Sequence, residues 1–171
     1  MSKLYTEIYK LKTILRKGWL MRNVGDYARV ESDAEHTFSM AILALEIITK
    51  ESLKLNQEKV LKMILFHELG EIDYGDHTPH EHIPSAVKHE NEQKCVERLA
   101  KECGMPEILS IWQEYEEGKT MEAQFVKKID KLDAVMQSKV YSNISGNQNL
   151  FDEFKTNSLK IANEFKKYVE D

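Results

Sequence analysis

Ionisable side chains interrupt three otherwise apolar segments of the sequence. His36 lies in an apolar segment that begins near residue 33, and the pair His67-Glu68 lies at the end of a second. Asp130 interrupts a third segment late in the chain. A buried polar group is costly unless it is hydrogen-bonded or bound to a metal. Imidazole and carboxylate groups together suit a divalent cation, so these residues are candidate ligands for one.

Two further acidic residues extend this set. Glu71 follows His67 by four residues, which in a helix would place both side chains on one face. Asp133 lies one helical turn after Asp130, where it could hold a ligand histidine in place or form a surface ion pair. Taken singly, each residue has a structural interpretation as a hydrogen-bonded histidine or a surface acid. Their combination over three segments indicates a metal site.

A histidine-rich stretch follows the second segment. His77, His80 and His82 lie within six residues of one another, in a turn-rich segment that spans residues 70–83. These histidines could form a second metal centre, or they could line the edge of a pocket mouth. The sequence leaves both interpretations open.

Four sequence blocks give the pattern a context. They are LKTILRKGWLMRNV (11–24), ESDAEHTFSMA (31–41), FHELGEIDYGDHTP (66–79) and FVKKIDKLDAVMQ (125–137). Together with the order H…HE…D, these blocks resemble the HD-domain metal-dependent phosphohydrolases, in particular the bacterial 5′-deoxynucleotidases and their eukaryotic HD-domain relatives. The H-[DE]-x-x-E-x-x-x-G-D element in the third block is the most specific part of the resemblance.

The resemblance implies a role for each motif residue. The implied metal ligands are His36, His67, Glu68 and Asp130. The implied catalytic residues are Glu71, Asp76 and Arg16. Arg16 would also bind the substrate phosphate, while Asp76 would contact the sugar or assist proton transfer. Trp19 could stack on a base, or it could be an ordinary, partly buried aromatic residue.

The implied activity is hydrolysis of a phosphomonoester, with a nucleoside or deoxynucleoside 5′-monophosphate as substrate. A divalent metal ion (Mn, Co, Fe, Ni, Zn or Mg) would be the cofactor, and the family favours a homodimer. Three alternatives remain open from the sequence. They are a catalytically silent HD-fold module that binds a nucleotide or metal, an HD phosphodiesterase or triphosphohydrolase, and a helical protein with accidental motif matches.

The chain departs from the family pattern at the histidine-acid pair. The second residue is usually Asp, and here it is Glu68, whose carboxylate reaches one methylene further. Coordination by Glu68 therefore requires an adjusted rotamer or backbone. Gly18, near Arg16, is a second departure because a glycine at that position is not universal in the family.

Helical periodicity predicts the elements that must position these residues. Apolar spacing predicts helices over 3–15, 33–50, 56–69, 85–103, 106–116, 121–144 and 149–169. A capping box formed by Ser32 and Glu35 begins the second helix, and residues 16–29 read as a long loop. Gly104 and Gly118 are the predicted stops of the helices over 85–103 and 106–116. We therefore expect an all-α helical bundle of about six or more helices. It would be a single HD domain over 1–171, with the motifs between 11 and 137.

Composition narrows the class of protein. With 171 residues and 42% hydrophobic content, the chain can bury a core without disulfides. A net charge of −5 argues against a nucleic acid polymer as the main partner. The absence of a leader pattern or a long apolar run, together with two cysteines read as free thiols, predicts a cytoplasmic protein without membrane attachment. The predicted helix 149–169 would cover the core or a dimer partner.

Overall fold

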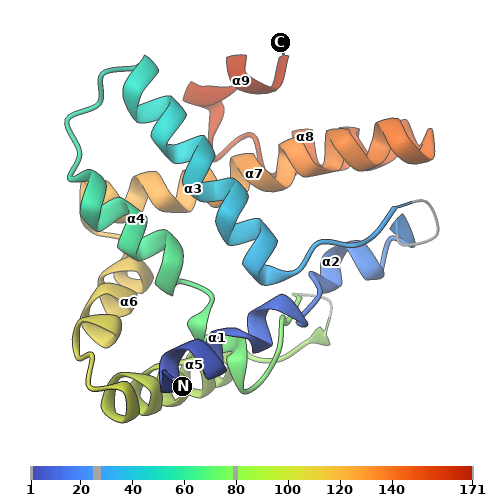
Figure 1. Cartoon of the computed structure of the whole chain (residues 1–171). Helices are drawn as coiled ribbons and strands as arrows, with labels where there is room; N and C mark the ends of the chain where they lie inside the picture. The colour runs from blue at the N-terminus through green and yellow to red at the C-terminus, as the bar shows by residue number, and fades with distance from the viewer. Residues whose placement is uncertain (1, 25–27, 79–80, 171) are drawn as a thin grey trace.

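The computed structural model describes residues 2–24, 28–78 and 81–170. The regular elements of these residues are helices, apart from one isolated antiparallel bridge between Leu15 and Ser32 (Figure 1). The elements in chain order are α1 (Lys3–Ile8), η1 (Lys10–Lys12), α2 (Lys17–Leu20), α3 (Asp33–Lys50), α4 (Gln57–Phe66), η3 (Leu69–Ile72), α5 (Ser85–Cys103), α6 (Glu107–Glu117), α7 (Met121–Ser145), α8 (Gln148–Asn157), η5 (Asn163–Phe165) and α9 (Lys167–Glu170). The predicted all-α class is confirmed.

The capping box at the start of α3 has the predicted form. The Ser32 side chain accepts a hydrogen bond from the Glu35 amide at 3.3 Å. In return, the Glu35 carboxylate accepts one from the Ser32 amide at 2.8 Å. Two amides that a helix start leaves unpaired are satisfied in this way, which fixes where α3 begins.

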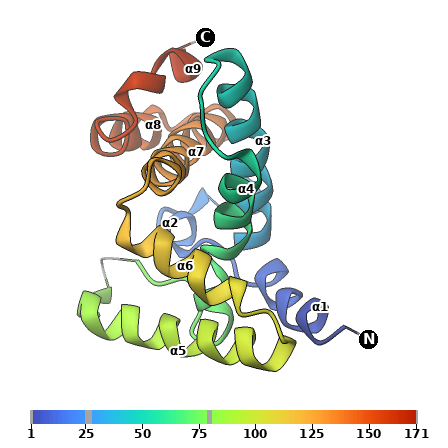
Figure 2. The same cartoon turned by 90° about the vertical axis from the view of Figure 1, so that its left-hand side faces the viewer.

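The main core lies between α3, α4, α6 and α7. Met40, Ile47, Met63 and Ile129 are fully buried there, and the chain's C-terminal residues close its outer side. A second apolar cluster joins η3 to α5 and α6, around Leu99. In the two views at right angles, α3 and α7 lie next to each other, while α5 lies at the end of the molecule away from α9 (Figures 1 and 2).

Helices α5 and α6 end at left-handed glycines, as the sequence predicts. Gly104 has φ +65° and Gly118 has φ +63°, a conformation that favours glycine. Gly70 serves a different purpose, because a Cβ atom there would lie 2.6 Å from the Cβ atom of Glu92. The missing side chain therefore allows η3 to approach α5 closely.

Several predicted boundaries are wrong. The helix predicted over 3–15 ends at Ile8, and a 3₁₀ turn then leads into the bridge at Leu15. The segment 16–29, predicted as loop, contains the short helix α2. The helix predicted over 149–169 ends at Asn157 and is followed by turns and by η5.

The helix predicted over 56–69 begins after the Asn56 cap but ends at Phe66. Because the chain then turns and enters η3, His67 and Glu71 are not on one face of a continuous helix. The end of α4 therefore lies at the histidine-acid pair itself.

None of the helices in the described part of the chain combines the length and the apolar composition that a membrane span requires.

Candidate metal and phosphate site

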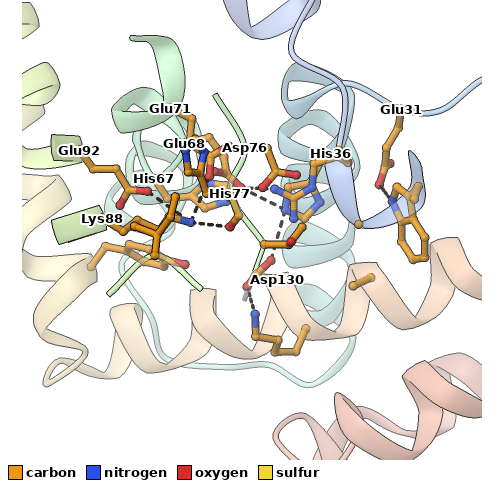
Figure 3. Close-up of a pocket in the computed structure, with 18 of the residues that line it drawn as sticks. Glu31, His36, His67, Glu68, Glu71, Asp76, His77, Lys88, Glu92 and Asp130 are labelled. Atoms are coloured by element: carbon orange, nitrogen blue, oxygen red, sulfur yellow. Dashed lines mark hydrogen bonds and ion pairs between the residues drawn. The ribbon is translucent and has the colours of Figure 1, made fainter. Parts of the chain in front are cut away.

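All of the site residues implied by the motifs line one cavity of about 580 Å³. These residues are Arg16, Trp19, His36, His67, Glu68, Glu71, Asp76 and Asp130. They come from α2 and its N-terminus, the first turn of α3, the end of α4, η3, the loop after it, and α7 (Figure 3). Six parts of the chain thus converge on one cavity.

His36 is held from behind by a carboxylate. Its Nδ1 atom lies 2.7 Å from an Asp133 carboxylate oxygen, and its side chain is 1% exposed. Its Nε2 atom points the other way, 3.3 Å from the Asp130 Oδ1 atom and 3.7 Å from the Glu68 Oε1 atom. Asp133 therefore occupies the position of a residue that orients a ligand histidine.

His67 has the same arrangement on the opposite side. As the C-terminal cap of α4, it places its Nδ1 atom 2.7 Å from the Ile64 carbonyl oxygen. A carbonyl oxygen only accepts, so Nδ1 carries the proton and the Nε2 lone pair is free. That Nε2 atom lies 3.2 Å from the Glu68 Oε1 atom.

The Nε2 atoms of both histidines are buried and make no hydrogen bond within the described residues. The ligand atoms of His36, His67 and Glu68 all lie within 4.8 Å of one another. Buried histidines with one nitrogen anchored and the other free, beside carboxylates, match the donor set of a divalent transition metal. The residues therefore fit the cation that the sequence pattern implies.

Charge in the cavity also suits a cation. Burial opposes protonation of His36, but the neighbouring carboxylates of Asp130 and Asp133 outweigh it and raise the pKa of His36 to about 9. Burial likewise opposes ionisation of Glu68, yet the neighbouring His67 and Arg16 hold its pKa well below the usual range. The centre of the cavity thus stabilises positive charge beside an ionised carboxylate.

Glu71 has the opposite tendency. Burial, together with the neighbouring carboxylates of Glu68 and Asp76, raises its pKa well above the usual value. Its Oε2 atom is buried without a hydrogen bond in the described structure. A carboxyl group that keeps its proton near neutral pH can donate that proton to a leaving group.

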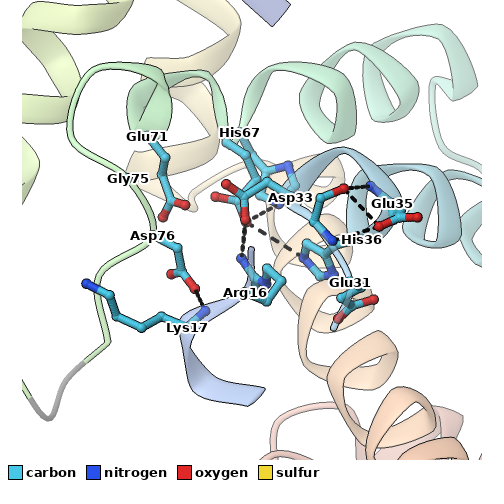
Figure 4. Close-up of polar contacts among 12 residues, drawn as sticks. Arg16, Lys17, Glu31, Asp33, Glu35, His36, His67, Glu71, Gly75 and Asp76 are labelled. Carbon is cyan, nitrogen blue, oxygen red and sulfur yellow. Dashed lines mark hydrogen bonds and ion pairs between the residues drawn. The ribbon is translucent and has the colours of Figure 1, made fainter. Parts of the chain in front are cut away.

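Arg16 enters the cavity from the residue before α2. Its amide donates to the Glu31 carbonyl oxygen at 2.9 Å, next to the Leu15–Ser32 bridge, and this fixes its backbone (Figure 4). Its Nη1 atom donates to the Glu68 Oε1 atom at 2.7 Å. Asp76 lies beside it, because an Asp76 carboxylate oxygen accepts from the Lys17 amide at 2.6 Å.

Trp19 is more buried than a base-stacking residue would be. Its side chain is 3% exposed, and its indole NH donates to Glu31 at 2.7 Å. Its ring centroid lies 4.5 Å from that of Phe154 and 5.3 Å from that of Tyr141. The geometry favours the packing role for Trp19 over stacking on a substrate.

The extra histidines do not form a cluster in the described residues. His77 lines the cavity, and its Nδ1 atom lies 3.0 Å from the Gly75 carbonyl oxygen. His82 is exposed and is not among the residues that line the cavity, while His80 lies outside the described residues. His77 is therefore the member of this group that is placed to meet a ligand.

Sequence reasoning missed two charged residues at the site. Asp33, within the capping box, has the sequence context of an ordinary acid in a first helical turn, and no motif marks it. Lys88 looked like part of a solvated face of α5, but it lies 3.5 Å from Glu71 and 3.3 Å from Glu92, and it donates to the His77 carbonyl at 3.1 Å. The sequence signal that could have indicated a role for Lys88 is Gly70, because a residue without a side chain there lets α5 approach η3 closely.

The fold and the donor set define an all-helical protein with a buried histidine–carboxylate centre for a divalent cation. A family model described as HD domain matches residues 8–169. The chain belongs to the HD domain family.

Named relatives agree with this assignment. The 5′-deoxynucleotidase HDDC2 of Dictyostelium discoideum is 36% identical over 141 residues, which cover 77% of this chain and 72% of the relative. The 5′-deoxynucleotidase HDDC2 of Bos taurus is 30% identical over 148 residues, which cover 85% and 69% of the two chains. The sequence-based resemblance to HD-domain 5′-deoxynucleotidases is confirmed.

Solved structures share the fold over almost the whole chain. A conserved hypothetical protein from Pyrococcus furiosus superposes with a TM-score of 0.76 at 32% identity, covering 98% of this chain and 97% of the other. A predicted metal-dependent phosphohydrolase from Magnetospirillum magnetotacticum gives a TM-score of 0.69 at 27% identity, with 97% and 89% covered.

Proposed function

We propose that this protein is a metal-dependent phosphomonoester hydrolase that acts on nucleoside or deoxynucleoside 5′-monophosphates. The observation that carries the proposal is the pair of buried, unpaired Nε2 atoms of His36 and His67 facing Glu68, in a cavity that Arg16 also lines. The family, and relatives named 5′-deoxynucleotidase, support the substrate class.

In this proposal the cation is held by His36, His67, Glu68 and Asp130. When bound, it would supply Lewis-acid polarisation of a phosphoryl oxygen and a lowered pKa for a water molecule. Arg16 would bind the phosphate through its planar array of N–H donors, which matches phosphate geometry. Its side chain is 19% exposed, so these hydrogen bonds would form largely out of solvent.

In this proposal Glu71 and Asp76 act on the leaving oxygen and on the sugar of the substrate. Glu71, with its raised pKa, is placed to donate a proton to the leaving 5′ oxygen as the phosphorus–oxygen bond breaks. Lys88 contacts Glu71 from α5 and fixes the position of its carboxyl group. Asp76, held by the Lys17 amide at the same wall, would contact the sugar.

The test is phosphate release by purified, metal-supplemented protein from a panel of 5′- and 3′-nucleoside monophosphates, both ribo and deoxy. We expect turnover of the 5′-monophosphates only. The Glu68→Asp variant is measured beside it, since it restores the residue usual at this position. Absence of phosphate release from the whole panel in both proteins would contradict the proposed activity.

A second candidate is a catalytically silent module that binds a nucleotide or metal. The observation that favours it is the 2.7 Å ion pair between Arg16 and Glu68, which joins the proposed phosphate ligand to a proposed metal ligand. The same panel separates the two functions. Silence of the native protein with turnover by Glu68→Asp would favour the binding module.

We also propose a homodimer and a cytoplasmic location, the latter with Cys95 and Cys103 as free thiols. The aromatic residues of the C-terminal segment are used within one chain, because Phe165 is buried and Phe151 and Phe154 pack against the core. An exposed apolar pair on α3, Phe38 and Ile42, is the better candidate contact. A monomeric mass in light scattering would contradict the dimer.

A further inference from the structure

Asp33 is a buried carboxylate that the proposed reaction has not used. It is the first residue of α3, it is 0% exposed, and neither of its carboxylate oxygens accepts a hydrogen bond within the described structure. A buried carboxylate without partners is costly, so it needs a compensating charge nearby. Within the described residues, the one cation within 4 Å of Asp33 is Arg16, whose Nη1 atom lies 3.8 Å from the Asp33 Oδ1 atom.

The backbone brings these two side chains together. On one side of the Leu15–Ser32 bridge the Arg16 amide donates to the Glu31 carbonyl at 2.9 Å. On the other side the Asp33 amide donates to the Ile14 carbonyl at 3.0 Å. Residues next to a bridged pair point to the opposite face from that pair, so Arg16 and Asp33 share a face.

Arg16 and Asp33 differ in their access to the cavity. Arg16 lines the cavity, whereas Asp33 is not among the residues that line it. Figure 4 shows Asp33 next to Glu35 and His36 at the start of α3, on the same side as Arg16. Asp33 can therefore affect a ligand in the cavity only through a neighbour. Glu68, Glu71 and Asp76 also lie near it, but they are acidic, and Arg16 is the cation that pairs with it.

We propose that Asp33 is a positioning residue for Arg16. Its fixed carboxylate keeps the guanidinium directed into the cavity, so that Arg16 does not depend on Glu68 as its only ionic partner. Glu68 is then available for the cation. This inference rests on the proposed function for its substrate, but the contact between Asp33 and Arg16 can be tested without turnover.

The first measurement is steady-state kinetics of Asp33→Asn, which removes the charge and keeps the size. We expect KM for the nucleotide to rise about tenfold, within the range of coupling between neighbouring residues, while kcat changes much less. Glu35→Gln is the matched control, because it removes a carboxylate from the same first turn of α3 outside the cavity. Its KM should equal that of the native protein.

The second measurement is a double-mutant cycle on the binding of inorganic phosphate, followed by calorimetry. We expect Asp33→Asn to weaken phosphate binding about tenfold in the native background and to have no further effect in an Arg16→Met background. Mn²⁺ affinity, measured in the same four proteins, should be unchanged by Asp33→Asn. Should Asp33→Asn fail to fold, Asp33→Ser takes its place in the cycle.

Two results would overturn the proposal. Equal losses of phosphate affinity in both backgrounds would mean that Asp33 does not act through Arg16. A loss of Mn²⁺ affinity in both backgrounds would mean that Asp33 is a metal ligand instead. Failure of the proposed function looks different, because the native protein would then turn over no nucleotide while the phosphate cycle still reported coupling between the two residues.

Discussion

Helix α3 has one buried face along its length, but the first turn and the later turns of that face have different chemistry. Asp33 and His36 in the first turn are 0% and 1% exposed, and both carry buried polar atoms without a hydrogen bond. Ala44 and Ile47, two to three turns later, are equally buried and purely apolar. Equal burial thus has two different results, a packed core at one end and unpaired ligand atoms at the other.

Helix α7 repeats this contrast between adjacent residues. Ile129 is fully buried in the main core, while the next residue, Asp130, faces His36 across the cavity. Unpaired polar atoms lower stability, so their presence in the site indicates selection for a bound ligand. Variants in the two regions should therefore separate activity from folding.

The largest effect is expected for His67→Ala. Removing the Nε2 donor should abolish binding of a divalent metal and reduce phosphate release by several orders of magnitude, because one of two imidazole ligands is lost. Metal content by elemental analysis and phosphate release measure both. Glu71→Ala is the control, since it should retain the metal and lose turnover by about 10²–10⁴-fold. Normal turnover in Glu71→Ala would remove Glu71 from the reaction.

The converse variant is Ile129→Ala in the core. We expect it to lower the free energy of unfolding by about 2–5 kcal/mol, because it leaves a cavity among fully buried neighbours. Its folded fraction should still bind one metal per chain with native affinity. Urea unfolding and metal titration check the two halves of this prediction, and a large loss of metal affinity would show that core and site are coupled.

An intermediate effect is expected for Gly70→Ala, at the contact between the site and α5. A new Cβ atom would lie 2.6 Å from the Glu92 Cβ atom, so α5 must move away from η3. Overpacking of this kind typically costs about 1–3 kcal/mol. Because Lys88 is carried on α5, we also expect turnover to fall more than it does in Ala162→Gly, a small-residue change in the distant core. Equal turnover in the two variants would argue against a role for Lys88.

The smallest effect is expected for Glu35→Gln. Hydrogen bonds from Arg29 and from the Ser32 backbone lower the pKa of Glu35 from 4.5 to about 2, so the folded state favours its ionised form. That contribution is present above pH 4.5 and is lost as the pH falls towards 2. The native protein should be more stable than Glu35→Gln by about 1 kcal/mol at neutral pH, with a gap that closes in acid. A gap that is constant with pH would contradict this.

Local signals predicted the parts of the fold that depend on a few neighbouring residues. The Ser32–Glu35 capping box gave the start of α3, and Gly104 and Gly118 gave the ends of α5 and α6. The motif residues converge because the order of the blocks matches the family. The capping box and the glycine stops depend on hydrogen bonds and φ angles within a few residues, so the residue types at those positions predict them.

The features that the sequence did not predict depend on packing between residues far apart in the chain. Leu159, Ala162 and Phe165 are buried three residues apart, which suits a 3₁₀ turn and breaks the helix predicted over 149–169. The segment before α3 pairs with Ser32 at Leu15 instead of continuing as helix. Asp33 was missed for the same reason, since its partner Arg16 arrives from across that bridge.

The Leu15–Ser32 bridge has a consequence for how the chain can vary in length. The bridge closes a loop that runs from Arg16 to Glu31. The backbone hydrogen bond between these two residues fixes both ends of the loop. Lengthening a closed loop costs little, about 0.6 kcal/mol for each doubling. A change in the number of residues between Arg16 and Glu31 should therefore cost little at the bridge, so Arg16 and Asp33 can keep their positions while the enclosed chain varies in length.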